Sequence, residues 1–242
     1  MGKPVLCLAV MLFASGWSTA EDALETARRS FDMKALEAVH ETILKEAGEA
    51  PQDAARQLRA AEGYRLLANH WRHRRHILEL PSKEEKDAEA RQVALAKAGL
   101  PFAEAALRLA DTDAARAQAN RCAGELHAYQ ITGMVSGMRN GPKAKRYCDE
   151  AIRLAPTDAE CRRAIGEMYL YNPPMNGGDA EKAVETFSAL SGDAADSDVY
   201  PVLLAMAYRK KGDIPMARKA AHTALSRNPR NEDASLLVKV LQ

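Results

Sequence analysis

The sequence has few aromatic residues, no excess of either charge and only four cysteines. Aromatic residues make up 5% of the 242 residues. β-Sheets draw heavily on aromatic and β-branched residues, whereas alanine, the commonest residue here, favours closely packed helices. The 34 Lys and Arg residues nearly cancel the 33 Asp and Glu residues. Composition therefore predicts an all-α fold, and charge alone provides no field that would hold nucleic acid or anionic lipid.

Sequence signatures of enzymes are also missing. The chain contains no G-x-S-x-G, no phosphate-binding Gly-rich loop and no H-E-x-x-H. The pair Gly177–Gly178 is too short for a nucleotide loop and follows a predicted helix rather than a strand. We therefore expect a protein that is not an enzyme and has no cofactor.

The first 20 residues have the pattern of a secretory signal peptide. Lys3 precedes the apolar run "VLCLAVMLFA", and the following "SGWSTA" has small residues at Ser18 and Ala20. The apolar run is too short to span a bilayer permanently. We expect cleavage after Ala20 and a single mature domain, residues 21–242, that is periplasmic or secreted and has no membrane span. An uncleaved anchor is the alternative.

Three cysteines remain in the mature chain: Cys122, Cys148 and Cys161. An oxidising compartment favours disulfides, but an odd number allows at most one internal bridge. The pair Cys148–Cys161 is slightly favoured for such a bridge, because these residues belong to successive predicted helices. The alternative is three buried thiols that pack as small apolar side chains.

Histidines cluster in "NHWRHRRHILEL", where His70, His73 and His76 are spaced three apart. Neighbours at this spacing can face one another on a helix, and imidazole suits several transition metals. No carboxylate follows until Glu79, so closing a four-ligand site would need a distant helix. We therefore predict no metal site and interpret the cluster as the polar end of a long helix.

Repeated segments provide the strongest evidence for the fold. "ALRLADTDA" starts at Ala106 and "AIRLAPTDA" starts at Ala151, and seven of their nine positions are identical. "ALSRNPRNE", from Ala224, keeps the alanine and the proline at matching offsets. Such recurrence indicates a stacked helical array. The last copy also has the spacing of a 34-residue helix–turn–helix unit, at Leu204, Ala205, Tyr208, Ala217, Ala221, Ala224 and Pro229.

This spacing resembles the tetratricopeptide repeat (TPR). One unit upstream, the gap between Tyr169 and Ala183 is longer than the repeat allows, and it holds the segment "YNPPMNGGDAEKA". We interpret residues 172–178 as an enlarged, exposed turn that prolines and glycines fix between two helices. This insertion, with "FDMKALEAVHETI" and "NGPKAKRYCDEAIRLAPTDAECRRAIGEMY", resembles exported TPR-like proteins, including the T component of TRAP-type uptake systems.

The resemblance implies a TPR-like right-handed α-solenoid of about five helix–turn–helix units with a C-terminal capping helix. We expect helices near residues 21–30, 33–46, 52–79, 83–110, 113–138, 142–155, 158–171, 179–190, 196–211, 214–227 and 231–241.

In TPR units, four positions of each first helix line the concave groove. The resemblance assigns these positions to a set of predicted binding residues: Arg121, Glu125, Glu160, Arg163, Glu167, Leu170, Met206 and Arg209. It also places Gln118 and Val202 there, and Tyr64 and Leu67 with a less certain alignment. The groove lacks the Lys and Asn of the carboxylate clamp that binds acidic C-terminal tails, because Glu125 and Glu167 occupy the Asn positions.

Two functions fit these features. The first is a non-catalytic exported scaffold that binds a protein or peptide through a row of arginines, Arg121, Arg163 and Arg209, on the concave face. The second is an accessory that binds a small organic ligand, as the resemblance to the T component implies. A structural alternative is that the Arg–Glu pairs are i,i+4 ion pairs that contribute only to stability.

Overall fold

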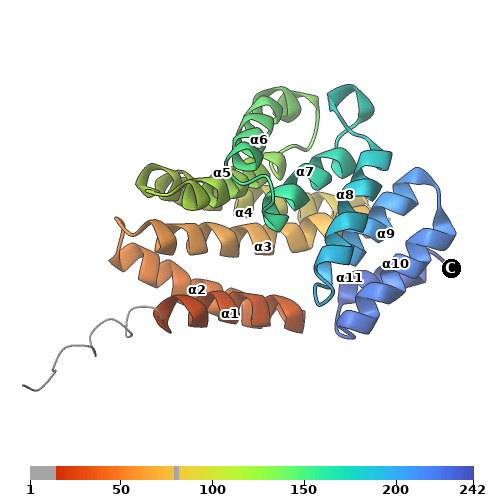
Figure 1. The fold of residues 1–242 in the computed structure, drawn as a ribbon, viewed down its shortest axis with the longest axis horizontal. Helices are drawn as coiled ribbons and strands as arrows, with labels where there is room; N and C mark the ends of the chain where they lie inside the picture. Colours follow the sequence, from red (N-terminus) through yellow and green to blue (C-terminus); the bar gives the residue numbers. More distant parts are fainter. Residues whose placement is uncertain (1–14, 79–81) are drawn as a thin grey trace, which may run out of the picture.

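The computed structural model describes residues 15–78 and 82–242, and in this part of the chain all regular secondary structure is helical (Figure 1). Eleven α-helices and one 3-10 helix follow one another: α1 (Ser15–Ser30), α2 (Met33–Glu49), α3 (Ala54–Ile77), α4 (Ser82–Leu109), α5 (Asp113–Ala128), α6 (Met134–Leu154), α7 (Ala159–Tyr171), η1 (Pro174–Asn176), α8 (Ala180–Asp193), α9 (Val199–Lys211), α10 (Ile214–Arg227) and α11 (Glu232–Val240).

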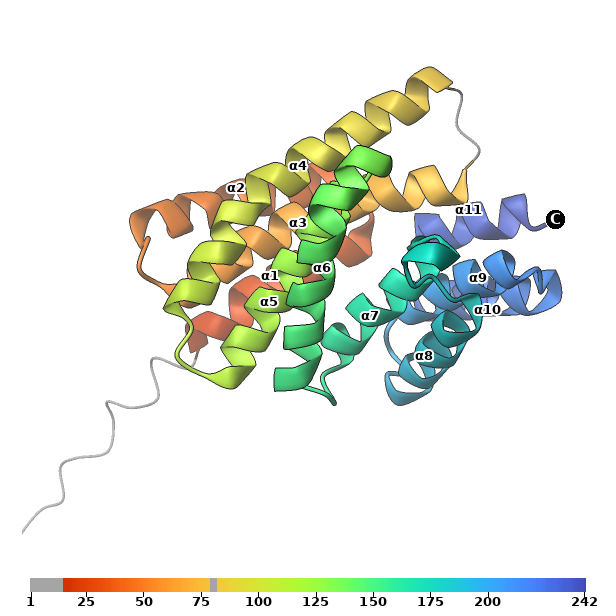
Figure 2. The ribbon, with the colours of Figure 1, turned by 90° about the horizontal axis from the view of Figure 1, so that it is seen from above.

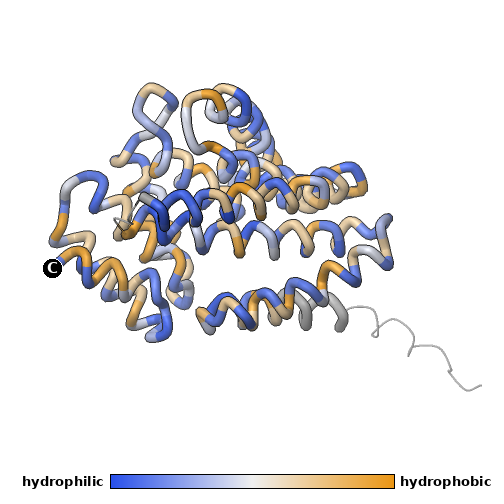
Figure 3. The backbone as a smooth tube through the Cα atoms, turned by 180° about the vertical axis from the view of Figure 1, so that it is seen from behind, coloured by the Kyte–Doolittle hydropathy of each residue, from blue (hydrophilic) through white to orange (hydrophobic). Residues whose placement is uncertain are grey.

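The helices pack as five successive pairs, α1–α2, α3–α4, α5–α6, α7–α8 and α9–α10, and α11 covers the last pair. This arrangement confirms the predicted all-α solenoid with a C-terminal capping helix. Figure 3 shows hydrophobic and hydrophilic residues interspersed along the helices, so each helix can bury one face against its neighbours.

Acidic and hydroxyl side chains start most of the helices. Asp53, for example, accepts hydrogen bonds from the backbone N–H groups of Ala55 and Arg56 at the start of α3. In the two near-identical repeats the cap differs by one position: Thr112 caps α5, and Asp158 caps α7. These caps satisfy N–H groups that have no partner inside the helix, and they fix where each helix begins.

The structure places one pair of helix boundaries differently from the sequence-based expectation. The sequence predicts helices at 113–138 and 142–155, but α5 ends at Ala128 and α6 begins at Met134. Ser136 Oγ accepts hydrogen bonds from the backbone N–H groups of Thr132 and Gly133, which establishes the start of α6. Pro142 lies inside α6 with its ring exposed, and the opposite face of this helix is packed on α5, which holds the helix through the proline.

The turn at residues 172–178 has the predicted form. It is mostly exposed, contains η1, and is closed by hydrogen bonds from the N–H groups of Gly177 and Gly178 to Pro174 O and Pro173 O. Gly177 has a φ of 86°, which glycine adopts at little cost. The Asp179 N–H donates to Tyr169 O at 2.9 Å, which joins the two helices across the insertion.

Two contacts connect the beginning of the array to its end. Asp198, which is fully buried, accepts hydrogen bonds from Arg28 Nη2 (2.7 Å) on α1 and from Asn228 and Asn231 Nδ2 (2.7 and 2.9 Å). The long α3 also reaches α11, as Figure 2 shows, and His73 Nδ1 lies 2.7 Å from Asp233 Oδ2. The repeats therefore curve far enough for the first and last units to touch.

All three cysteines of the described residues are free and buried. They match the interpretation of three buried thiols, and the bridge considered between Cys148 and Cys161 is not formed. Cys148 packs against Gly124 of α5, whereas Cys161 packs at the start of α7 with Ala117 and Ala151. Burial raises the pKa of the Cys161 thiol to about 12, so the thiol is protonated and inert at neutral pH.

The predicted signal peptide, residues 1–20, lies largely outside the residues that the structure describes, which start at Ser15 in α1. Among the residues that the structure describes, no helix is both long and apolar enough to cross a bilayer.

Two glycines provide a matched test of helix packing. A Cβ on Gly166 of α7 would lie 2.8 Å from the Phe187 ring of α8, whereas a Cβ on Gly192 would meet nothing within 4 Å. We expect Gly166→Ala to lower the free energy of unfolding by about 1–3 kcal/mol through overpacking. Gly192→Ala should raise it by about 0.5–1 kcal/mol, since alanine is the better helix former. Urea unfolding followed by circular dichroism measures both. A Gly166→Ala protein as stable as the wild type would contradict this packing.

Candidate functional site

The concave side of the array encloses a cavity of about 1280 Å³. The first helices of four successive pairs, α3, α5, α7 and α9, contribute to its wall, together with α1, the start of α2, the end of α4 and the start of α11. The wall contains both apolar and charged side chains. Its charged residues on α3, α5 and α7 include Arg59, Glu62, Arg65, Arg121, Glu160 and Arg163.

A buried network of arginines and glutamates forms one side of this cavity. Arg163 Nη1 and Nη2 bind the two carboxylate oxygens of Glu125 at 2.7 and 2.9 Å, and Nη1 also contacts Glu167. Glu125 also accepts a hydrogen bond from a second guanidinium group, that of Arg121, whose Nη1 lies 2.7 Å away. Arg163 is 2% exposed and Glu125 3%. Ions buried this deeply are tolerated only when they are paired, and here each one is.

The network continues onto α3. Arg121 Nη2 contacts Glu62, Arg65 Nε donates to Glu62 at 2.6 Å, and Arg72 Nη1 donates to Glu167 at 2.8 Å. Arg72 also lies over the Tyr129 and Tyr171 rings, 4.6 and 3.7 Å from their centroids. Side chains from α3, α5 and α7 are thus joined by contacts between residues far apart in the sequence.

The arginines keep the glutamates of this network ionised. Burial alone would raise the pKa of the Glu125 carboxyl, but the guanidinium groups of Arg163, Arg65 and Arg121 outweigh burial and hold that pKa well below its usual range. Burial would likewise raise the pKa of Glu160, whereas Arg163 and Arg121 lower it to about 2. At neutral pH the site therefore holds ion pairs rather than neutral acids.

The predicted site residues fall into two groups. Arg121, Glu125, Glu160, Arg163 and Glu167 lie in one network, and three of them (Arg121, Glu160 and Arg163) line the cavity. Gln118 and Val202 line it as well. The other predicted residues lie elsewhere: Leu170 and Met206 are buried in the C-terminal hydrophobic core, and Arg209 donates to Ile77 O at the end of α3 (2.9 Å).

The arginines therefore do not form a row of free guanidinium groups. Arg121 and Arg163 do make the i,i+4 pairs that the sequence allows, but these pairs are buried rather than exposed. Arg209 takes no part in them. Because these pairs are buried, removing Arg163 would strand Glu125 and Glu167 in the protein interior, so this arginine contributes to folding.

Sequence reasoning missed the contribution of Glu62 and Arg65, and placed Tyr64 and Leu67 in this position instead. The sequence does contain a spacing that identifies Glu62 and Arg65. In α3, α5 and α7 the same spacing recurs, as Glu62–Arg65, Gln118–Arg121 and Glu160–Arg163, and in each case the arginine Nε donates to the side chain three residues earlier, at 2.6, 2.9 and 2.9 Å. This shared spacing places α3 in register with the two later helices.

Of the guanidinium groups in the wall, Arg59 differs from the others. Its Nε is buried and has no hydrogen-bond partner within the described chain. A buried donor without a partner is costly, and a ligand acceptor would satisfy it.

The histidines of α3 have separate neighbours. His73 pairs with Asp233, His76 lies against the Tyr171 ring, and His70 packs edge-on to Trp71. Burial and the nearby Arg72 and Arg75 lower the pKa of His76 to about 3, so it is neutral at physiological pH. Within residues 15–78 and 82–242, no three His, Cys, Asp or Glu side chains are grouped as metal ligands would be.

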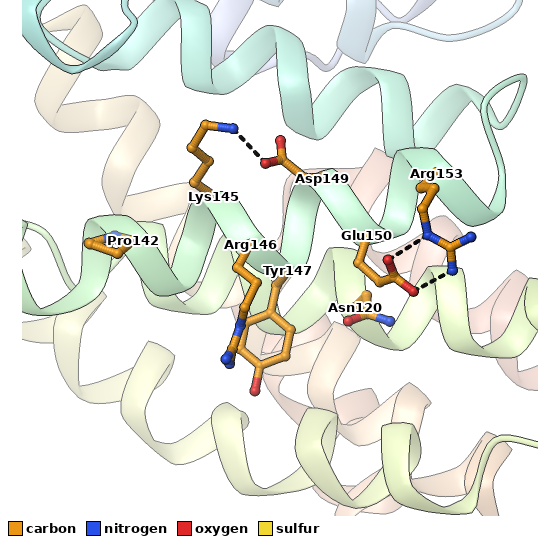
Figure 4. Close-up of a pocket in the computed structure, with 8 residues that line it drawn as sticks. All are labelled: Asn120, Pro142, Lys145, Arg146, Tyr147, Asp149, Glu150 and Arg153. Carbon is orange, nitrogen blue, oxygen red and sulfur yellow. Dashed lines mark hydrogen bonds and ion pairs between the residues drawn. The ribbon is translucent and has the colours of Figure 1, made fainter.

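A second hollow, of about 660 Å³, lies on the surface of α6 beside α5 (Figure 4). Its charges are largely satisfied within the helix: Arg153 Nε and Nη2 each bind Glu150 at 2.7 Å, and the Arg146 guanidinium lies over the Tyr147 ring. This hollow has no buried charged group comparable to those of the cavity.

The network predicts a large effect for one arginine and a small effect for another. Arg163→Ala leaves Glu125 and Glu167 without their central partner, and we expect the free energy of unfolding to fall by about 3–5 kcal/mol. Arg153→Ala removes an exposed pair on α6 and should change stability little. Chemical denaturation of both variants tests this, and equal effects would show that the buried network does not stabilise the fold.

The chain matches no protein-family model and no curated protein. Among solved structures it is similar to TTC0263, a thermophilic TPR protein from Thermus thermophilus. That structure has a TM-score of 0.62 and 14% identity over 92% of this chain and 98% of its own.

Two further structures are less similar. YrrB, a TPR protein with an unusual peptide-binding site, has a TM-score of 0.43 and 18% identity over 83% of this chain and 99% of its own. The APC/C hetero-tetramer Cut9–Hcn1 has a TM-score of 0.45 and 12% identity over 85% of this chain and 39% of the matched chain. With its repeated helix pairs and its likeness to TTC0263, the protein has a TPR-like fold.

Proposed function

We propose that this protein is a non-catalytic helical-repeat scaffold that binds an extended segment of a protein or peptide in the concave cavity. The observation that carries the proposal is the cavity itself, whose wall combines residues of α3, α5, α7 and α9. A segment lying there contacts several repeat units at once, which is how curved helical arrays gain binding area.

The charges of the wall favour a segment that carries both signs. Carboxylates outnumber guanidinium groups, and the exposed acidic residues Asp32 and Asp111 lie on the wall. These residues favour basic side chains of the segment. The unpartnered Arg59 Nε favours an acidic side chain deeper inside. A purely acidic tail is disfavoured, since most guanidinium groups are already occupied by Glu62, Glu125 and Glu160.

Blocking the cavity tests this proposal. Ala115 is half-buried at the start of α5 and lines the cavity, whereas Ala38 is exposed on α2 and does not line it. Peptides selected from a random library on the wild type should bind Ala115→Trp about tenfold or more weakly. They should bind Ala38→Trp with unchanged affinity, as measured by fluorescence anisotropy. Selected peptides that bind all three proteins equally would place recognition outside the cavity.

A small-molecule accessory resembling the T component of TRAP-type uptake systems is the second candidate. One observation favours it: contacts between α1 and the C-terminal units bring the two ends of the array together beside the cavity, so the cavity is more sheltered than the groove of an open array. Concave sites with apolar and charged lining suit organic ligands. If a set of small organic acids, and no library peptide, stabilises the wild type thermally and fails with Ala115→Trp, the accessory function replaces the scaffold function.

We further propose that the protein is exported and acts in the periplasm or outside the cell. Support comes from the basic start, the short apolar run and the small residues before Glu21. We expect mass analysis of the protein recovered from an envelope fraction to give a chain that begins at Glu21. An intact N-terminus in the cytoplasmic fraction would contradict export.

A further inference from the structure

The beginning of α6 exposes large apolar side chains. Met134, Val135 and Met138 are 82%, 77% and 68% exposed. They lie within the first turn and a half of one helix, so they are neighbours on its surface. Scattered single apolar residues are normal on a protein surface, but three adjacent ones at this exposure indicate a surface that another molecule covers.

Glycines lie beside these residues at every fourth position. A Cβ on Gly133 or Gly141 would meet nothing within 4 Å, and a Cβ on Gly137 would meet only the Ile131 methyl group, at 3.7 Å. No tertiary contact within the molecule therefore requires glycine here. Each glycine inside a helix weakens the helix relative to alanine. Because glycine has no side chain, it allows the backbone of a second molecule to approach closely.

Basic side chains continue the same helix. Residues 132–148 contain four Lys and Arg residues and no Asp or Glu. Lys145 pairs with Asp149, but Arg139, Lys143 and Arg146 form no ion pair among the described residues. All three are exposed. We call the face formed by Met134, Val135, Met138, Arg139, Lys143 and Arg146 the α6 surface.

The α6 surface is separate from the cavity. No residue of α6 lines the cavity, because α6 is the second, outer helix of its pair. In Figure 1, α6 lies at the top of the molecule and α1 lies at the bottom. A partner on this surface would leave the cavity accessible.

We propose that the α6 surface docks an amphipathic helix of a partner protein, with an apolar stripe on the methionines and carboxylates facing Arg139, Lys143 and Arg146. Methionine is flexible and polarisable and suits surfaces that adapt to another side-chain pattern. The three exposed cations without an ion pair favour a partner of opposite charge. A second copy of this chain would bring the same cations together, and like charges facing each other across an interface are unfavourable.

An anionic membrane would also satisfy the charges, but the apolar residues fit it less well. Segments that lie in the membrane interface usually carry Trp, Phe or Leu among their apolar residues, and residues 132–148 contain none of these three. A bilayer also gives no reason for the open glycines. A partner helix packed on this surface would contact the exposed apolar side chains, the glycines and the cations together.

The probe is a synthetic helical peptide with leucines at i, i+3 and i+4 spacing and glutamates on both sides of that stripe. We expect it to bind the full-length wild type at least about tenfold more tightly than a scrambled peptide of the same composition. The double variant Arg139→Glu/Lys143→Glu should lose about tenfold or more in affinity. A peptide with lysines in place of the glutamates should then bind this variant and not the wild type, which restores binding by exchanging charges.

Matched controls exclude a general effect of net charge. Lys34→Glu/Lys219→Glu reverses two exposed lysines on α2 and α10 and should bind the glutamate peptide like the wild type. Val135→Gln/Met138→Gln should bind it about tenfold more weakly with unchanged circular dichroism. Equal binding of the native-order and scrambled peptides would overturn the proposal. So would binding to vesicles of phosphatidylglycerol without binding to the peptide, or dimerisation that the Val135→Gln/Met138→Gln change abolishes.

Discussion

Arg163 and the two buried glutamates that it binds, Glu125 and Glu167, are the constraint on which the interior of this protein depends. Three charged side chains lie almost fully buried, and none of them is tolerable there alone. Glu125 comes from α5 and Arg163 from α7, so the ion pairs fix how far one repeat is rotated against the next. Most repeat arrays hold adjacent units together with apolar contacts. Here a polar layer on the concave side adds a geometric requirement, because a bidentate guanidinium–carboxylate pair forms in few orientations.

The same network explains the position of α3. Glu62 and Arg65 align this helix with α5 and α7. Because α3 is long, His73 near its end reaches α11, and Ile77 reaches α9. Asp198 completes the contact from the other end by holding Arg28 of α1. An open solenoid would offer a groove. Because the first and last units touch, this one surrounds a cavity that is partly open to solvent, and residues of the ion-pair network form one side of its wall. A substitution such as Arg163→Ala would therefore disturb the fold and the proposed binding site together, whereas Ala115→Trp changes the cavity wall without removing an ion pair.

The inside and the outside of the array offer different chemistry. The cavity wall is charged but largely self-neutralised, so it discriminates by the arrangement of charges rather than by their sum. The α6 surface is apolar at its tip and positively charged along its length, with cations that no acidic neighbour among the described residues neutralises. The two surfaces therefore differ in both charge balance and apolar content, and they lie on different helices.

The sequence by itself determined the class of fold, the order of the helix pairs, most of their starts and the form of the turn at residues 172–178. These follow from local chemistry: alanines at repeat spacing, Asp and Thr caps, and prolines and glycines that interrupt helices. It also contained the Arg–Glu pairs, because i,i+4 neighbours are set by the helix alone. Only the tertiary structure decided that these pairs are buried, that Glu125 is shared by Arg121 and Arg163, and that Arg209 is excluded. The tertiary structure also shows that α6 continues past Pro142 and that Met134 is exposed. Burial and curvature arise from contacts between residues distant in the chain, such as Arg28 with Asp198. The rotation between successive helix pairs adds up over five pairs to bring these two residues together, and no local sequence pattern encodes that rotation.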